Sequence, residues 1–299
     1  MMMKKSRKIP FRGAATALVT PFSDGAADLE ALERLIEFQI DGGISAIVLL
    51  GTTGENPTVE TDERQRITET AAEQIGGRIP LIVGTGSNST EHAVLLTKLA
   101  CQAGADYVLA VTPYYNKANP DGLIRHFTAI ADASCCPVIL YNVPSRTNVN
   151  IPLSVYRELA KHGNIVGVKE SSGSMTQAAE ILGETDLALY SGNDGDNAAL
   201  LSMGASGVIS VLSNILPRKV SALCEAALDG DFRTAAKLQL DQTALISALF
   251  SDVNPIPVKA GLAMMGLCRE ELRLPLTPLS GEKREKLKNK MIKAGIYLP

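Results

Sequence analysis

Eight short apolar segments, each followed by a stretch of helical periodicity, constrain the fold of this chain more than any other feature. The segments lack the polar alternation of half-exposed strands, as expected of parallel strands covered on both faces. Their bounds are 14–19, 46–50, 81–83, 107–111, 138–141, 165–168, 187–190 and 208–211. Between them lie amphipathic segments such as 28–40, in which leucines and isoleucines share one helical face. The pattern predicts strands that alternate with helices.

Eight strand–helix units within about 225 residues predict an α/β fold, a (β/α)₈ TIM barrel. A doubly wound sheet is the alternative. It would normally carry a glycine-rich fingerprint after the first strand, where this chain has Thr20-Pro21-Phe22. The strand pattern stops near Pro217, and segments 217–228, 231–249, 256–267 and 280–294 look helical. We therefore expect a barrel catalytic domain over residues 1–225 and a C-terminal helical appendage over residues 226–299.

The charge balance limits the choice of partners. The chain has 29 basic and 32 acidic residues, so no basic excess predicts a nucleic-acid partner. A basic cluster at Lys4, Lys5, Arg7 and Lys8 is expected to be a solvated tail, because no apolar signal region follows it. No apolar run approaches the roughly 20 residues that span a bilayer. We expect a cytoplasmic protein with no membrane contact.

The cysteines and histidines give little support for metal chemistry. None of the five cysteines forms a CxxC pair, and their apolar surroundings predict buried, reduced thiols. The three histidines have no second ligand at helical spacing. The prediction is that there is no metal site and no catalytic cysteine.

Lys169 is the most informative polar residue. Catalytic groups of parallel barrels lie at the carboxyl ends of the strands, and Lys169 ends the apolar run 165–168. Partial shielding from water there favours the neutral amine, the form that attacks a carbonyl. The alternatives are an ion pair with Glu170 or a side chain that points to solvent. A second lysine in an apolar setting, Lys259, is expected to serve packing or an ion pair.

Other strand ends supply groups that suit a small oxo-acid. The Gly-Thr-Thr-Gly turn after the second strand offers the hydroxyls of Thr52 and Thr53 and backbone N–H groups to a carboxylate. The phenols of Tyr115 and Tyr141 can transfer protons. Arg146 carries a planar fork that fits a second carboxylate. A capped turn, packing tyrosines and a surface salt bridge are the corresponding structural alternatives.

Together these motifs resemble the dihydrodipicolinate synthase family, also called 4-hydroxy-tetrahydrodipicolinate synthases, within the N-acetylneuraminate lyase superfamily. The resemblance runs from about Gly13 to the C-terminus. The lysine and first-threonine motifs mark only the superfamily, whereas the arginine-bearing loop and the double tyrosine favour the synthases. The matching motifs are GTTGE at 51–55, TPYY at 112–115, YNVPSRT at 141–147, VKESS at 168–172 and NPIPVK at 254–259.

The resemblance implies a role for each residue of the reaction centre. Lys169 would form a Schiff base with pyruvate, and Tyr141 would transfer protons. Thr53 would link Tyr141 to Tyr115, which this family supplies across a subunit contact. Thr52 and Thr53 would also hold the pyruvate carboxylate.

The resemblance also implies the substrates and the assembly. Pyruvate would condense with L-aspartate 4-semialdehyde, as in diaminopimelate and lysine biosynthesis. Arg146 would bind the carboxylate of the aldehyde, and Ile209 would line the pocket. No metal or organic cofactor is implied, and the family is usually a homotetramer built from tight dimers.

The chain departs from the family pattern at the lysine-effector positions. Lysine-sensitive members usually carry two histidines where this chain has Thr61 and Arg64, and an acidic residue where it has His92. Asn88 and Tyr114 remain. We therefore expect weak inhibition by L-lysine, or none.

Two other functions stay open at this point. The first is another pyruvate-dependent class I aldolase, such as an N-acetylneuraminate or sugar-acid lyase. Arg146 and Tyr115 count against it, because a polyol substrate has no second carboxylate for that loop. The second is a non-enzymatic protein that binds an oxo-acid, which would have no need of the nucleophile Lys169.

Overall fold

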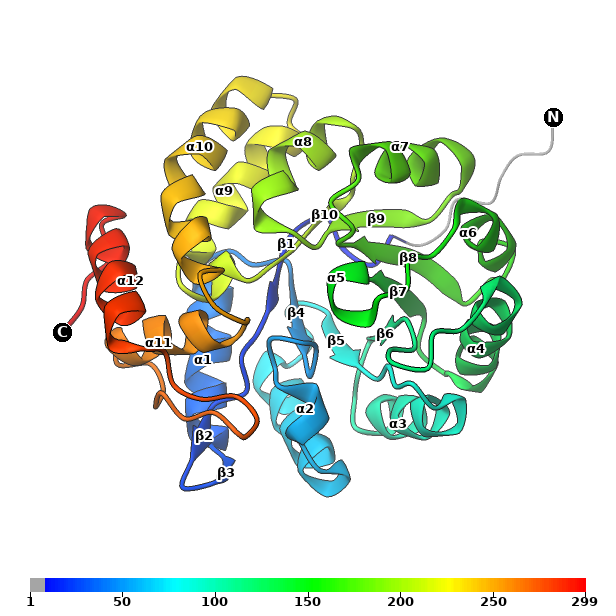
Figure 1. Ribbon diagram of the computed structural model, residues 1–299, viewed down its shortest axis with the longest axis horizontal. Helices are drawn as coiled ribbons and strands as arrows, with labels where there is room; N and C mark the ends of the chain where they lie inside the picture. Colours follow the sequence, from blue (N-terminus) through cyan, green and yellow to red (C-terminus); the bar gives the residue numbers. More distant parts are fainter. Residues whose placement is uncertain (1–8) are drawn as a thin grey trace.

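The computed structural model describes residues 9–299 and contains a closed barrel of eight parallel strands (Figure 1). Each strand pairs with its neighbours in chain order, and β1 closes the ring against β10. The predicted (β/α)₈ barrel is thereby confirmed. The predicted basic tail lies outside the described residues. The barrel strands are β1 (Gly13–Ala17), β4 (Ala46–Leu49), β5 (Leu81–Gly84), β6 (Tyr107–Val111), β7 (Val138–Asn142), β8 (Ile165–Glu170), β9 (Ala188–Ser191) and β10 (Gly207–Ser210).

Helices surround the barrel, and local capping fixes where they begin. The carboxylate of Asp28 accepts from the backbone N–H of Ala31 at 2.9 Å, and Ser89 caps the third helix in the same way. None of the helices within residues 9–299 is long and apolar enough to cross a membrane. The helices of the ring are α1 (Leu29–Asp41), α2 (Thr61–Ile75), α3 (Thr90–Gln102), α4 (Pro120–Ala133), α6 (Leu153–Leu159), α7 (Met175–Glu184), α8 (Asn197–Ser202) and α9 (Pro217–Leu228).

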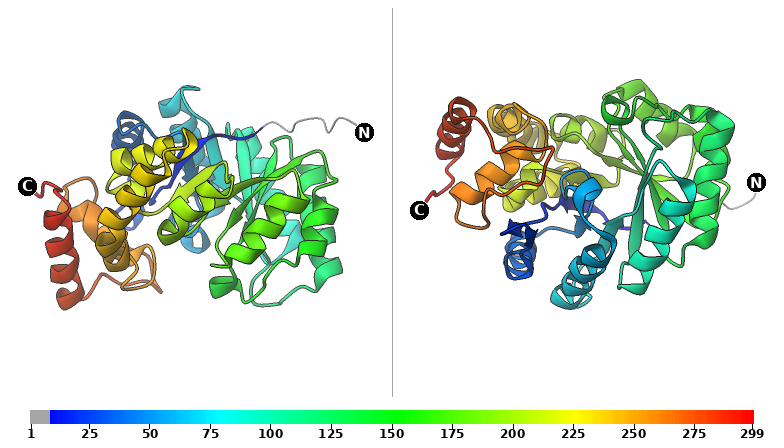
Figure 2. Two further views of the ribbon diagram at one scale, coloured as in Figure 1. Left: turned by 90° about the horizontal axis from the view of Figure 1, so that it is seen from above. Right: turned by 60° about the horizontal axis from the view of Figure 1, so that its bottom comes forward.

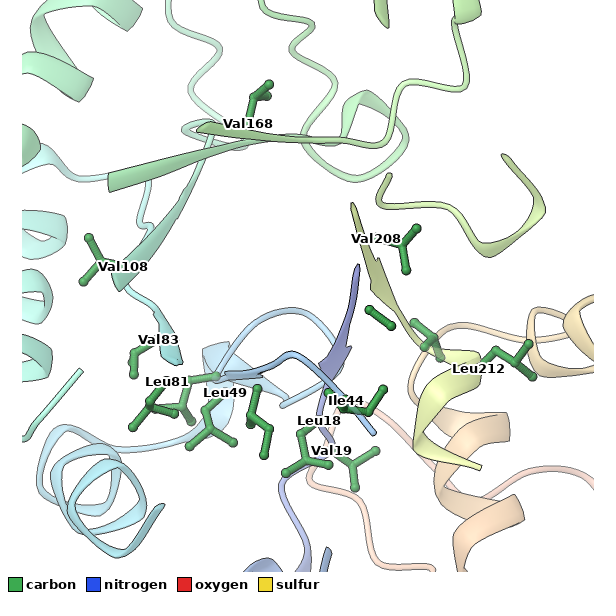
Figure 3. Close-up of a cluster of buried hydrophobic side chains, with 14 of the residues drawn as sticks. Leu18, Val19, Ile44, Leu49, Leu81, Val83, Val108, Val168, Val208 and Leu212 are labelled. Carbon is green, nitrogen blue, oxygen red and sulfur yellow. The ribbon is translucent and has the colours of Figure 1, made fainter. Parts of the chain in front are cut away.

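Two apolar cores lie on opposite faces of the strands. Successive strand residues point to opposite faces, so Ala15 and Val48 fill the barrel interior while Val83, Val108 and others face the helices. Figure 3 shows part of the outer core, with side chains from several strands directed away from the barrel axis. Burial on both faces explains why the strands read as continuous apolar runs.

The C-terminal appendage packs on one side of the barrel (Figure 2). It comprises α10 (Phe232–Leu249), α11 (Ile256–Met264) and α12 (Gly281–Lys293), and α10 packs against α8, α9 and α12. The boundary expected between residues 225 and 226 falls inside α9, which packs against β1 and β10. We therefore propose that the barrel unit extends to the end of α9.

A small hairpin after β1 was not predicted. Strands β2 (Phe22–Ser23) and β3 (Ala26–Ala27) pair antiparallel. The Glu271 carboxylate accepts from the backbone N–H groups of Asp24 and Gly25, at 2.9 and 2.6 Å. Because that carboxylate lies almost 250 residues away in the chain, local sequence pattern could not reveal the turn.

Candidate active site

A cavity of about 300 Å³ opens at the carboxyl ends of β4 to β7. Strand ends and the following loops supply most of its wall, including Thr52, Tyr141 and Arg146. The appendage supplies Asn254 on the other side, and Tyr114 lies between. This is the face on which parallel-barrel enzymes carry their active sites.

Lys169 and Tyr141 are neighbours across the β7–β8 ladder. Both side chains are buried, and the Lys169 ammonium nitrogen Nζ lies 4.4 Å from the centroid of the Tyr141 ring. Glu170 belongs to the other face of the strand, where it accepts from Asn142 Nδ2 at 3.0 Å and from the Tyr156 hydroxyl at 3.2 Å. Lys169 forms no ion pair within the described part of the chain. The alternatives of an ion pair with Glu170 and of a solvent-directed side chain are therefore wrong.

Gly192, which follows β9, lies against Ser171 and the Lys169 side chain. A Cβ atom built on Gly192 would lie 1.9 Å from the Ser171 hydroxyl and 3.0 Å from Lys169 Cε. A side chain at this position would therefore displace the Ser171 hydroxyl and crowd the lysine. The sequence places Gly192 just after the apolar run 187–190 but carries no local signal that connects this glycine with the lysine.

The Gly-Thr-Thr-Gly turn borders the cavity and uses only some of its own backbone donors. Its own hydrogen bonds use the backbone N–H groups of Gly54 and Glu55, which donate to the carbonyls of Gly51 and Thr52 at 3.2 Å. Within residues 9–299 the N–H groups of Thr52 and Thr53 have no protein acceptor. Thr52 lines the cavity, and Thr53 is buried beside it.

Asn254 joins this turn to the arginine loop. Its side-chain nitrogen donates to the Thr53 hydroxyl at 3.0 Å, and its carbonyl accepts from Arg146 Nη2 at 3.0 Å. Arg146 lies in the short helix α5 (Pro144–Thr147) and is exposed at the cavity rim. Sequence reasoning missed this role of Asn254, although the NPIPVK motif was the available signal.

The hydrogen bonds of the predicted phenol relay are not formed within residues 9–299. Thr53 makes no hydrogen bond to Tyr141 or Tyr115 among the described residues. Tyr115 is 90 % exposed and has a φ of +73°, whereas its neighbour Tyr114 lines the cavity. Ile209 is buried in the same interior cluster as Tyr141 but is not part of the cavity wall. The relay and the Ile209 contact stay predictions.

Lys259 has the structural role that the sequence predicted. Its Nζ lies 2.5 Å from the Glu55 carboxylate and 2.7 Å from the carbonyl of Glu271, and both side chains of the ion pair are buried. Burial lowers the pKa of Lys259, although Glu55 acts in the opposite direction. Glu55 also accepts from the backbone N–H of Arg273 at 3.0 Å. The ion pair therefore ties the strand-end turn to the appendage.

The expectation of uniformly buried thiols is wrong. All five cysteines are free, but Cys135 is exposed and Cys101 and Cys268 are half-buried. Cys101, Cys135 and Cys136 lie at the end of the barrel opposite the cavity, because Cys135 and Cys136 precede the start of β7. They have no part in the candidate active site.

The closed parallel barrel, with a cavity and a buried lysine at the carboxyl ends of its strands, defines the class of (β/α)₈-barrel enzymes. Comparison with known proteins specifies the family. Residues 10–294 match the family model described as the dihydrodipicolinate synthetase family, and the chain belongs to that family. The resemblance stated from the motifs is thereby confirmed.

Individual relatives are similar along almost their whole length. A 4-hydroxy-tetrahydrodipicolinate synthase from Geobacter sulfurreducens is 49% identical over 279 residues, which cover 93% of this chain and 96% of the relative. The crystal structure of dihydrodipicolinate synthase from Aquifex aeolicus has a TM-score of 0.95 and 44% identity, covering 96% of this chain and 99% of that one. The chloride-inhibited enzyme from Acinetobacter baumannii, complexed with pyruvate, has a TM-score of 0.94 and 42% identity, with coverage of 96% and 99%.

Proposed function

We propose that this chain catalyses the Schiff-base condensation of pyruvate with L-aspartate 4-semialdehyde, the activity of a 4-hydroxy-tetrahydrodipicolinate synthase and a step of diaminopimelate and lysine biosynthesis. Membership of the family supports this activity. The observation that carries it is the buried Lys169 amine, which has no anionic partner within residues 9–299 and lies beside the Tyr141 ring next to the cavity.

The Lys169 amine attacks the keto carbon of pyruvate, and the carbonyl oxygen leaves as water when the imine forms. Loss of a proton from the methyl group gives an enamine. The enamine carbon then bonds to the aldehyde carbon of the second substrate, whose oxygen takes up a proton. The amine of that substrate finally displaces Lys169 and closes the ring. The Tyr141 ring lies beside Lys169 Nζ, and its phenol is the candidate for these proton transfers.

The two carboxylates of the substrates need separate donors. The unpartnered N–H groups of Thr52 and Thr53 suit the pyruvate carboxylate. Arg146 lies on the loop beyond Tyr141 and keeps guanidinium donors for the aldehyde carboxylate, since its one hydrogen bond within residues 9–299 is to the Asn254 carbonyl. Asn254 positions both groups through its contacts to Thr53 and Arg146.

We further propose a homotetramer in the cytoplasm. The exposure of Tyr115 supports an assembly, because an exposed phenol that does not line its own cavity can serve a neighbouring chain. Five free thiols suit a reducing compartment.

A coupled assay tests the function. With pyruvate plus L-aspartate 4-semialdehyde, turnover should be rapid, and with pyruvate plus N-acetylmannosamine it should stay at background. The reverse result would assign the chain to the sugar-acid aldolases. Activity with neither pair, by protein shown to be folded, would favour an oxo-acid-binding protein.

A further inference from the structure

Three thiols meet at the end of the barrel opposite the cavity. Cys101 lies in the last turn of α3, and Cys135 and Cys136 lie in the turn between α4 and β7. Their three Sγ atoms are all within 4.8 Å of one another. Cys136 is buried, Cys101 is half-buried and Cys135 is exposed, so solvent reaches one side of the cluster.

Hydrogen bonds hold the turn that carries this cluster. The Ser134 hydroxyl donates to the carbonyl of Cys136 at 2.6 Å, and the backbone N–H of Cys136 donates to the same hydroxyl at 3.2 Å. The Asn164 side chain donates to the carbonyl of Ser134 at 3.0 Å. The Ser134 hydroxyl also lies 3.6 Å from the Cys101 sulfur. These bonds fix the backbone of the turn that carries Cys135 and Cys136.

We propose that Cys101, Cys135 and Cys136 form a binding site for one thiophilic d¹⁰ cation such as Zn²⁺. Zinc bonds thiolate sulfur at about 2.3 Å, so two sulfurs of a tetrahedral site lie about 3.8 Å apart. All three sulfurs lie within 4.8 Å of one another, so no pair has to close by more than about 1 Å to reach that spacing. The fourth position faces solvent and takes water.

The chemistry of the cluster favours soft metals over hard ones. Thiolates select Zn²⁺ and Cu⁺, whereas Mg²⁺ and Ca²⁺ require oxygen ligands. Binding releases three thiol protons to water and transfers no electrons, so the centre has a net charge of −1 that the solvent-facing side tolerates.

Cobalt substitution tests this site. The full-length protein, reduced with a phosphine, is titrated with Co²⁺, which gives thiolate-to-cobalt charge-transfer absorbance that Zn²⁺ then removes. We expect one equivalent of each ion. Cys135→Ser removes a metal ligand and should weaken Co²⁺ binding by at least about a hundredfold. Loss of a group that only hydrogen-bonds to a ligand would have a smaller effect. Because Cys135 is exposed, this variant should fold normally, which circular dichroism checks.

A matched control and a footprint complete the experiment. Cys268→Ser changes a half-buried cysteine outside the cluster and should leave Co²⁺ binding unchanged. Zn²⁺ should protect Cys101 and Cys135 from alkylation but not Cys268. Absence of charge-transfer absorbance at excess Co²⁺, or equal binding by folded Cys135→Ser, would overturn the proposal. A Cys101–Cys135 disulfide that persists in excess reductant would overturn it as well.

Discussion

The end of β8 and the start of α11 each bury one lysine, yet the two lysines differ in their partners. At α11, Lys259 is enclosed by the Glu55 carboxylate, the Glu271 carbonyl and the Phe22 ring, whose centroid lies 4.1 Å from Nζ. At β8, Lys169 has the Tyr141 ring and no carboxylate partner within residues 9–299.

This difference separates a structural lysine from a candidate nucleophile. The Lys259 ammonium is ion-paired and hydrogen-bonded, and its removal leaves a buried carboxylate without compensation. Lys169 has no anionic partner within residues 9–299, which leaves its nitrogen available to attack a carbonyl. Burial alone does not distinguish these roles, because both side chains are almost inaccessible to solvent.

Replacing Lys169 should have the largest effect on activity. Lys169→Met removes the nucleophile, so kcat should fall by roughly 10⁴-fold or more, while the free energy of unfolding changes little. Borohydride reduction of the natural protein with pyruvate should add a pyruvate-derived mass to the peptide that contains Lys169, as read by mass spectrometry. A label on Lys259 would instead identify Lys259 as the nucleophile and Lys169 as the structural lysine.

The same substitution at the second lysine should act on stability. Lys259→Met leaves Glu55 buried without its cation, which should lower the free energy of unfolding by about 3–5 kcal/mol. Denaturant unfolding measures this loss. The double variant Lys259→Met/Glu55→Gln should recover part of it, because the uncompensated charge is gone. No recovery would indicate that packing, rather than charge, makes Lys259 necessary.

Replacing Tyr115 tests whether the proton relay beside Lys169 is complete within one chain. Tyr115→Phe should lower kcat by about a hundredfold, the lower end of the effect of losing a proton-transfer group. Mixing it with Lys169→Ala under subunit exchange should restore part of the activity, because a mixed pair would hold one intact site. If activity stays absent after exchange is demonstrated, the proton relay lies within one chain.

Arg146 donates to the carbonyl of Asn254, just before α11, and its loss should be selective. Arg146→Ala should raise the KM for L-aspartate 4-semialdehyde by about ten- to a hundredfold, because one charge-assisted carboxylate contact contributes roughly 1.5–3 kcal/mol. The KM for pyruvate should change far less. Steady-state kinetics with each substrate varied in turn gives both values, and equal changes would argue against the assigned role.

The smallest effect that we expect is a weak inhibition by L-lysine, and it depends on a third buried cation, Arg64. Arg64 donates to Asn56 and to the Gly84 carbonyl, the latter at 2.5 Å, and burial lowers its pKa to about 10. Tyr114 lies near enough to act on that pKa in the opposite direction. A cationic effector beside Tyr114 would therefore meet a like charge. Lysine titration at subsaturating pyruvate should show little inhibition, and half-maximal inhibition below about 1 mM would contradict this.

The sequence alone determined the barrel and much of the candidate site. Apolar runs and helical periodicity are local consequences of burial on both faces of a strand or one face of a helix, so they placed the strands and helices to within a few residues. Lys169 and Tyr141 could be selected for the same reason, because each ends or nearly ends a strand, and parallel strands bring their carboxyl ends to one face.

Only the tertiary structure decided which distant groups meet. Asn254 reaches Thr53 across 201 residues, and Cys101 meets Cys135 and Cys136 across more than 30. Neither contact has a periodic signature, because each depends on barrel closure and on the path of a loop. The partners of the two buried lysines were decided in the same way: a carboxylate from the strand-end turn reaches Lys259, and none reaches Lys169 within the described residues.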